Sequence, residues 1–314
     1  PTVRITVLSK AFLQPLFDNI PNVHFYAADV HSTHKGVLGL YQLYKELRTL
    51  KITHIADLHN VLRSKILCSF FKFSKKPIVV IDKGRAEKKA LTRTENNIFK
   101  QLKTSHQRYA DVFKKLGFSV DISTPSLVKK PALDKKIAEI TSTKQQQWIG
   151  IAPFAAFASK AYPLDLIKQV IENLSKEYDL FLFGGGASEI YSLSKIEKQT
   201  ENCISVAGKL TLKEELNLIA HLDCMVAMDS GNAHFAAMQQ VPTITLWGGT
   251  HPFAGFAPFH QPNDYCLLPD LEKYPKIPYS IYGNKTLKGY EDAMRTISVE
   301  TVLNKIREVA QKNS

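Results

Sequence analysis

The residue types between positions 228 and 252, MDSGNAHFAAMQQVPTITLWGGTHP, could hold a phosphate. An apolar run ends at Asp229, and a short helical pattern begins just after Gly231. The first N–H groups of a helix have no partner within it and lie at the positive end of its dipole. Gly231 would let a ligand approach them, while Ser230 and His234 add side-chain donors and Asp229 accepts from sugar hydroxyls. The alternative is helix capping, for which Asp and Ser are favoured.

Three further stretches follow apolar runs of the same kind. The turn GGTHP, which contains Thr250, closes the next run and would face the same ligand. Lys160 in SKAYP is the only charge in its run and could neutralise a departing phosphate. GGGASE lacks the third glycine of a dinucleotide fingerprint, which argues against NAD, but Glu189 in it could accept from ribose hydroxyls. The alternatives are a solvated loop lysine and a tight glycine turn with a surface glutamate.

The charge of the chain is concentrated in its first half. Residues 1–147 contain 26 Lys and Arg against 11 Asp and Glu, a net charge of +15. Residues 148–314 contain 15 against 18, a net charge of −3. A basic half indicates an anionic partner, such as nucleic acid, an acidic membrane surface or a phosphorylated substrate. Aromatic residues are not interleaved with the basic ones, which argues against nucleic acid.

Two basic stretches follow predicted strands of this first half. They are IADLHNVLRSK (55–65) and DKGRAEKKALTR (82–93). Arg63, Arg85 and Arg93 are the candidates in them, because the planar guanidinium binds phosphate or carboxylate well. The alternative is a pair of solvated basic helix faces.

The order of apolar runs predicts an α/β protein with two Rossmann-like domains. Strand-like runs alternate with helical patterns at the spacing of parallel sheets covered on both faces. The predicted division is an N-terminal domain (1–122), a linker with at most a short helical turn (123–147), a second domain (148–297) and a C-terminal helix (298–314) that can pack back on the first domain. Ligands bind at the carboxyl ends of such strands, and we expect the two domains to face a cleft.

Composition excludes several classes of protein. The chain has 314 residues, 44% hydrophobic and 22% charged, which is typical of a globular protein. No segment approaches the roughly 20 apolar residues of a membrane span. The four Cys have no CxxC spacing, which argues against a zinc site or a disulfide framework and fits the cytoplasm. The chain contains no Walker A loop, no G-x-S-x-G elbow, no H-E-x-x-H and no acidic pair suited to a metal.

Taken together, these motifs resemble bacterial heptosyltransferases, which form glycosyltransferase family 9 and build the inner core of lipopolysaccharide. The first half contributes DLHNVLRSK, which is similar to the D-L-Q-G-x-x-R-S of the family. The second half has five motifs in the order of the family, and they are IAPFAAFASKAYP, FGGGASE, AGKLTLKEEL, DSGNAHFAA and WGGTHP.

The resemblance implies a GT-B fold and inverting transfer of a heptose from an ADP-heptose donor, with no metal and no other cofactor. It implies that Lys160, Ser230, Gly231 and His234 hold the diphosphate, with Asp229 beside them and Thr250 in the closing turn. Glu189 would bind the ribose, and the adenine would lie along 208–210. The resemblance thus implies that Gly208, Lys209 and Leu210 contact the adenine.

The implied acceptor is an anionic glycolipid at the inner face of the inner membrane, with peripheral membrane contact. Asp57, Asn60, Arg63, Arg85 and Arg93 would lie on the acceptor side. The general base of the family lies in a G-D-V loop after its first strand, and here we expect that strand upstream of Pro1. Two alternatives remain at this point, namely a nucleotide-sugar epimerase on the same fold and a catalytically inactive sugar-nucleotide-binding module.

Overall fold

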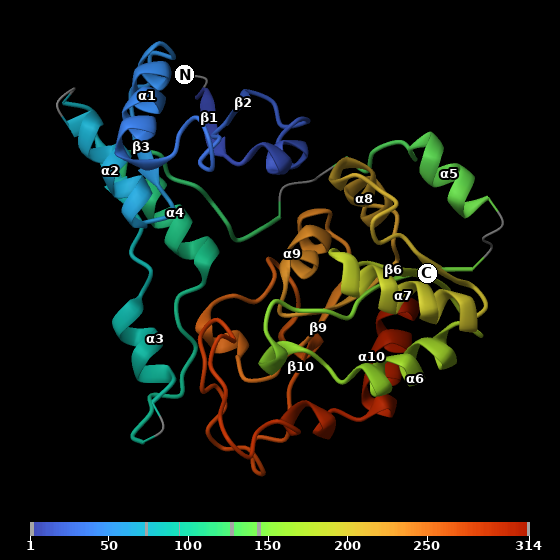
Figure 1. Cartoon of the computed structure of the whole chain (residues 1–314). Helices are drawn as coiled ribbons and strands as arrows, with labels where there is room; N and C mark the ends of the chain where they lie inside the picture. The colour runs from blue at the N-terminus through green and yellow to red at the C-terminus, as the bar shows by residue number, and fades with distance from the viewer. Residues whose placement is uncertain (1–2, 73–74, 94, 126–128, 143–145, 313–314) are drawn as a thin grey trace. The chain divides into compact units, whose positions relative to one another are not determined.

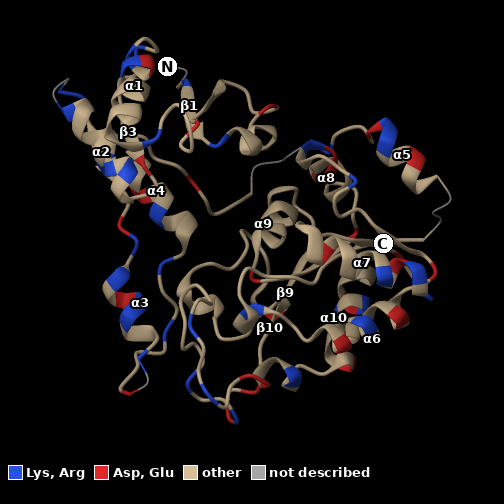
Figure 2. Cartoon of the chain, viewed as in Figure 1, with Lys and Arg blue, Asp and Glu red and all other residues tan. Residues whose placement is uncertain are grey.

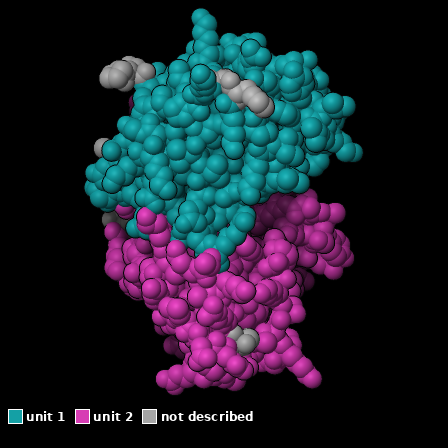
Figure 3. Space-filling view, turned by 90° about the vertical axis from the view of Figure 1, so that its left-hand side faces the viewer, with its two compact units in different colours: residues 1–85, 105–124 teal, residues 86–104, 125–314 magenta. Residues whose placement is uncertain are grey.

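The computed structural model describes residues 3–72, 75–93, 95–125, 129–142 and 146–312. The chain divides into two units, coloured separately in Figure 3. Unit 1 comprises residues 1–85 and 105–124, and unit 2 comprises residues 86–104 and 125–314. Both units alternate strands and helices, which confirms the predicted α/β class. None of the helices in these described ranges has the length and apolar composition that a membrane crossing requires.

Unit 2 is built on a six-stranded parallel sheet with the order β10-β9-β8-β5-β6-β7. The strands are β5 (Trp148–Ala152), β6 (Asp179–Leu182), β7 (Cys203–Ser205), β8 (Cys224–Met228), β9 (Thr243–Leu246) and β10 (Cys266–Leu267). The first five coincide with predicted runs. From β5 the chain builds the sheet outwards through β6 and β7, and then returns to the other side of β5 with β8. The direction of winding therefore reverses between β5 and β8, which is where open α/β sheets bind ligands.

Helices cover both faces of this sheet (Figure 1). One face carries α6 (Leu164–Leu174), α7 (Ala187–Gln199) and α10 (Val299–Lys312), and the other carries α5 (Lys135–Thr141), α8 (Leu212–Ile219) and α9 (Gly231–Met238). Successive strand side chains point to opposite faces. Accordingly, Ile149 and Ile151 of β5 pack in one core and Ala152 in the other. Short 3-10 helices lie in the connections, at Ala158–Lys160 (η2), Pro252–Ala254 (η3), Asn263–Tyr265 (η4) and Ala293–Thr296 (η5).

Unit 1 contains two parallel strand pairs among its described residues. The pairs are β1 (Ile5–Ser9) with β2 (Val23–Ala27), and β3 (Ile55–Asp57) with β4 (Ile78–Val80). Its helices are η1 (Ala11–Leu16), α1 (Gly36–Arg48), α2 (Leu62–Lys72) and α4 (Ser105–Lys115). The first pair, the second pair, α1 and α2 share one apolar cluster, in which the rings of Tyr44 and Phe71 lie 4.8 Å apart.

The run FSVDI (118–122), which alternates apolar and polar residues at the end of the predicted N-terminal domain, does not form a strand. Val120 is 49% exposed there, and the carboxylate of Asp121 accepts a hydrogen bond from the backbone N–H of Ser123. The alternating run therefore ends in a bend rather than in a paired strand.

The structure also differs from the predicted domain division in three places. Residues 86–104, with helix α3 (Arg85–Leu91), belong mostly to unit 2. Within the supposed linker 123–147, α5 docks on unit 2 through the fully buried Ile137, while residues 126–128 and 143–145 lie outside the described residues. The C-terminal helix α10 belongs to unit 2, where it packs on α6 and β8. The apolar stripe of α10 is buried in the core of unit 2.

Helix α10 packs on one face of the unit 2 sheet together with α6 and α7. Shortening a buried apolar side chain of α10 should therefore destabilise this unit. Ile306 is fully buried, so Ile306→Ala should lower the free energy of unfolding by about 2–5 kcal/mol, through lost burial and a new cavity. Asn304→Ala, on the exposed face of the same helix, is the matched control and should leave stability within about 0.5 kcal/mol. Denaturant unfolding followed by circular dichroism measures both. Equal effects would mean that α10 does not belong to the core of unit 2.

Candidate functional site

Three predicted residues meet where the winding of the unit 2 sheet reverses. Lys160 follows β5, Asp229 follows β8 and Thr250 follows β9. The Lys160 Nζ lies 3.0 Å from the Asp229 Oδ2, and both side chains are largely buried, with 13% and 9% exposed. The Thr250 hydroxyl donates to the same Asp229 oxygen over 2.9 Å. A buried cation and a buried carboxylate are therefore held together at the carboxyl ends of three adjacent strands.

The N-terminus of α9 lies immediately beside this ion pair. Ser230 is the N-cap residue, yet its side chain makes no capping bond. Its Oγ is buried and, among the described residues, without a hydrogen-bond partner. A Cβ placed on Gly231 would meet nothing within 4 Å, so the first helical N–H groups are accessible. A buried hydroxyl without a partner is costly, and an oxyanion at the helix terminus would satisfy it.

His234, in the first turn of α9, is electrostatically linked to the same pair. Burial lowers the pKa of its imidazole most, the Asp229 carboxylate opposes this by raising the pKa, and the Lys160 ammonium lowers it further. The ring is therefore favoured in its neutral form, in which it has one N–H to donate. We call six residues the phosphate seat, after the ligand that the sequence predicts for them. They are Lys160, Asp229, Ser230, Gly231, His234 and Thr250.

The turn 248–251, which closes β9, contacts Asp229 and the residue that precedes Lys160. The backbone N–H of Gly249 donates to the Ser159 carbonyl over 2.7 Å, next to Lys160, while Thr250 binds Asp229. A Cβ on Gly248 would lie 2.1 Å from the same Ser159 carbonyl oxygen. Glycine is required at position 248 because the two backbones approach so closely.

A second loop, 279–283, encloses the stem of Lys160 and was missed by the sequence analysis. The Ser159 hydroxyl donates to the Gly283 carbonyl over 2.6 Å, and a Cβ on Gly283 would lie 2.3 Å from the Lys160 Cδ. On the other side of the turn, the backbone N–H of Ser280 donates to the Gly249 carbonyl. No motif marks this loop in the sequence; its only signal is the isolated glycine in IYGNK.

His251 was also missed, although it follows Thr250 directly. Its Nδ1 accepts from the backbone N–H of Phe253 over 3.1 Å and caps η3, so the ring proton is on Nε2. The residue is 2% exposed, and burial lowers its pKa to about 4. Its signal in the sequence is positional, because His251 precedes a proline at the first position of a helix.

The residues expected to bind the nucleoside lie on the opposite side of β5. The Glu189 carboxylate accepts from the backbone N–H of Gly185 over 2.7 Å, which stabilises the glycine turn after β6. A Cβ on Gly208, where φ is +71°, would lie 2.7 Å from Ile190, so the turns after β6 and β7 pack together. Lys209 forms an ion pair with Glu197, and Leu210 packs against the core.

The predicted acceptor-side residues of unit 1 form a compact turn after β3. Asp57 accepts from the backbone N–H groups of His59 and Asn60 and from the Ser64 hydroxyl. Asn60 has a left-handed φ of 47°, which asparagine tolerates, and its Nδ2 donates to the Ile81 carbonyl. An Arg85 guanidinium nitrogen lies 3.5 Å from the Asn60 carbonyl.

The other two predicted arginines, Arg63 and Arg93, make no contact that ties them to this turn among the described residues. Arg63 is exposed in the first turn of α2. Arg93 is exposed too, but it belongs to the segment that is part of unit 2. The structure therefore gathers Asp57, Asn60 and Arg85 and leaves Arg93 in the other unit.

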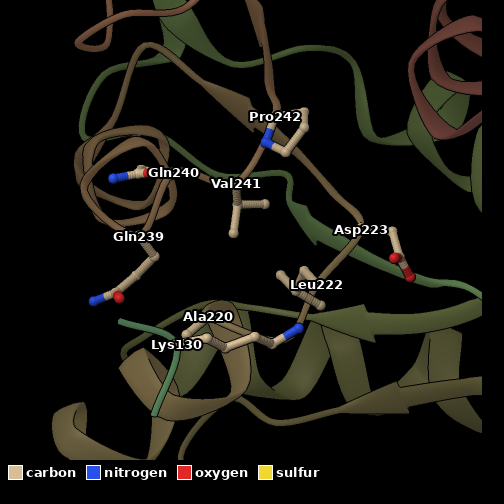
Figure 4. A pocket seen from close by; sticks show the side chains of 8 residues that line it. All are labelled: Lys130, Ala220, Leu222, Asp223, Gln239, Gln240, Val241 and Pro242. Carbon is tan, nitrogen blue, oxygen red and sulfur yellow. The ribbon is translucent and has the colours of Figure 1, made fainter. Parts of the chain in front are cut away.

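A separate cavity of about 210 Å³ opens at the amino ends of the strands of the unit 2 sheet, just before β8 and β9 (Figure 4). It is lined by Lys130, Ala220, Leu222, Asp223, Gln239, Gln240, Val241 and Pro242. None of the predicted site residues is among them. Since ligands of open α/β sheets bind at the carboxyl ends of the strands, the phosphate seat is the candidate functional site.

The two α/β units, one with a polar site where the winding of its sheet reverses, agree with the GT-B fold expected from the sequence. The family model of glycosyltransferase family 9 (heptosyltransferase) matches residues 40–281, and the chain belongs to this family. This confirms the resemblance found in the sequence. The chain is 27% identical to lipooligosaccharide heptosyltransferase 2 of Haemophilus influenzae, over 99% of this chain and 92% of that protein. It is 25% identical to lipooligosaccharide heptosyltransferase 2 of Campylobacter jejuni, over 83% and 76%.

Solved structures have the same fold. A glycosyltransferase family 9 protein from Veillonella parvula is similar with a TM-score of 0.74 and 18% identity, over 98% of this chain and 89% of that one. The Escherichia coli ADP-heptose lipopolysaccharide heptosyltransferase II is similar with a TM-score of 0.67 and 18% identity, over 99% and 91%. The fold is thus GT-B, as predicted, and the protein is a glycosyltransferase.

The lowered pKa of His251 makes stability depend on pH. The folded state favours the neutral ring, so this contribution is present above the unfolded pKa of 6.5 and is lost as pH falls towards about 4. Between pH 7 and pH 4.5, unfolding should become easier by about 2–3 kcal/mol on account of this ring. His251→Asn, whose side chain can also accept from Phe253, should remove that part of the pH dependence. Denaturant titrations of both proteins at the two pH values measure it, and an identical pH dependence would contradict the assignment.

Proposed function

We propose that this protein transfers a heptose from ADP-heptose to an anionic glycolipid acceptor, with inversion at the anomeric carbon. The observation that carries the proposal is the phosphate seat, with Lys160 buried beside the unpartnered hydroxyl of Ser230 and the open N-terminus of α9. All of these groups favour the negative charge of a diphosphate.

In the proposed reaction, an acceptor hydroxyl attacks the anomeric carbon of the donor. The new bond joins the acceptor oxygen to that carbon, and the bond from the carbon to the diphosphate oxygen breaks, with its electron pair leaving on the diphosphate. Lys160, the α9 N–H groups and Ser230 would stabilise this developing charge, the kind of electrostatic contribution that is often the largest in catalysis. No metal is needed in this scheme, because the cation is supplied by the protein. We assign no general base for the proton of the acceptor hydroxyl.

Within the same proposal, ADP extends from the seat across β5. Glu189 would accept from the ribose hydroxyls with a carboxylate that the Gly185 N–H already orients. The backbone of Gly208, Lys209 and Leu210 would lie along the adenine, and the packing of Gly208 on Ile190 holds that turn close to Glu189. This arrangement places the diphosphate where the winding reverses and the nucleoside over β6 and β7, as nucleotides lie in other open α/β sheets.

The acceptor class follows from unit 1 and from the relatives. Unit 1 contains 16 Lys and Arg against 7 Asp and Glu, a net charge of +9, distributed as Figure 2 shows. The named relatives are heptosyltransferases of lipooligosaccharide and lipopolysaccharide. We therefore propose a lipopolysaccharide inner core as the acceptor and the cytoplasmic face of the inner membrane as the place of reaction, and we expect no nucleic-acid partner. Asp57, Asn60, Arg63 and Arg85 would bind the acceptor.

Replacing Lys160 tests the leaving-group role. Lys160→Ala should lower kcat by about 2–4 kcal/mol of transition-state stabilisation, roughly 30- to 1000-fold, with a smaller change in donor affinity. Steady-state transfer from ADP-heptose and ADP binding by calorimetry separate the two effects. Lys176→Ala, an exposed lysine of the same unit, is the control for charge. An unchanged kcat in Lys160→Ala would make Lys160 a structural loop residue and would contradict the proposal.

Salt should separate acceptor binding from donor binding. Exposed charges are screened beyond about 8 Å at physiological ionic strength, so the acceptor KM should rise with salt while ADP affinity responds less. The double variant Arg63→Ala, Arg85→Ala should weaken acceptor binding and flatten its salt dependence. Arg48→Ala, Lys72→Ala removes the same charge at the C-terminal ends of α1 and α2 and should have little effect. If both double variants behave alike, the basic turn is not the acceptor site.

A further inference from the structure

The segment 86–104, which we call the strap, is anchored on unit 2 by its side chains. Leu91 is fully buried and forms one cluster with Leu102 of the strap and Ala254 of η3. At the start of the strap, the Lys88 ammonium lies 4.1 Å above the centre of the Phe256 ring. The strap is therefore fixed at both ends to residues 254–256, which follow the turn that closes β9.

The backbone of the strap packs equally tightly against the same residues. The backbone N–H of Leu102 donates to the Phe253 carbonyl over 2.9 Å. A Cβ on Gly255 would lie 2.6 Å from the Lys103 carbonyl oxygen and 3.0 Å from the Thr104 Cα, so only a glycine allows this approach. Side-chain burial, one backbone hydrogen bond and this close approach all hold the strap in one place on unit 2.

Three rings, one of them from the strap, meet directly after Thr250 of the phosphate seat. The Phe99 ring lies edge-on to the His251 ring, 5.0 Å between centroids, and 5.0 Å from the Phe253 ring. His251 and Phe253 themselves are 4.5 Å apart. Phe99 is 44% exposed whereas His251 is 2% exposed, so the phenylalanine covers the histidine from the solvent side. His251 also accepts the backbone N–H of Phe253, which fixes its ring plane.

His251 is bonded directly to Thr250, which is part of the phosphate seat. Thr250 donates to Asp229, and Gly249 binds the carbonyl next to Lys160. The seat can stabilise a leaving diphosphate only if these groups are already in place, since reorganisation during the reaction would use up the electrostatic gain. The placement of the turn 248–251 thus matters for rate more than for stability.

We propose that Phe99 and His251 are positioning residues of the phosphate seat, through which the strap holds Thr250, and thereby Asp229 and Lys160, in the geometry that the leaving group requires. This inference rests on the proposed function, because it assigns the two residues to the diphosphate of the donor. Neither residue touches the reacting atoms; both act through Thr250.

The first test compares two neighbouring residues of the strap. Phe99→Ala should lower kcat about 10-fold and change the donor KM by no more than about twofold, because small misplacements of catalytic groups cost rate rather than ground-state binding. Phe99→Tyr keeps the ring and should restore the rate. Ile98→Ala is the matched control, since Ile98 is similarly exposed, at 49%, and has no ring contact with His251. Thermal unfolding should be nearly the same for Phe99→Ala and Ile98→Ala.

The second test asks whether Phe99 acts through His251. In a double-mutant cycle, Phe99→Ala should have little further effect on kcat once His251→Asn is present, because residues that act as a unit are non-additive. Full additivity, or equal rates for Phe99→Ala and Ile98→Ala, would overturn the proposal. ADP binding and transfer by the wild type are measured in parallel. If the wild type fails there, the proposed donor is wrong; if only the Phe99 comparison fails, the positioning role is wrong.

Discussion

The candidate site depends on one constraint, which is that Lys160 and Asp229 are buried together. Removing two charges from water costs several kcal/mol per ion, and the pair is tolerated only when further polar groups satisfy it. Thr250 supplies one such bond to Asp229. The glycines at 248 and 283 bring the closing turn and the loop 279–283 against the lysine and its neighbour. Leaving either ion alone in this place would be strongly destabilising, so the surrounding turns are built around the pair.

An ion pair that satisfies itself would be a poor catalyst, and the geometry avoids this. Lys160 has three ammonium hydrogens and one carboxylate partner among the described residues, while the Ser230 hydroxyl and the first N–H groups of α9 have no side-chain acceptor. The carboxylate holds the lysine in place and balances its charge. A diphosphate would thus add acceptors to donors that are already oriented, which is how preorganised sites lower a barrier.

Much of unit 2 could be predicted from the sequence, because its signals are local. The apolar runs that became β5 to β9 are bounded by glycine or polar turns, and the Thr211–Glu214 capping box forms as its spacing predicts. The same holds for Lys160, Asp229 and Thr250, each of which lies in the connection that follows a strand. Two things could not be read in this way. The strap belongs to unit 2 through long-range contacts such as the packing of Leu91 and Leu102, and the alternating run at 118–122 lacks a pairing partner, which no propensity reveals.

The two units also differ in how deeply their strands are buried, and this difference matches the proposed division of donor and acceptor binding between them. The strands of unit 2 are almost wholly buried, whereas those of unit 1 are half-buried and its surface is strongly basic. Stabilising the charge of a leaving diphosphate needs fixed groups at short range inside a dry core. Binding a large anionic glycolipid needs long-range attraction by exposed cations that can adjust to it. The strap has features of both, since all its cations except Lys88 are exposed, while its leucines and Phe99 pack against residues 251–254 beside the phosphate seat. Part of the basic first half of the chain is thereby tied to unit 2.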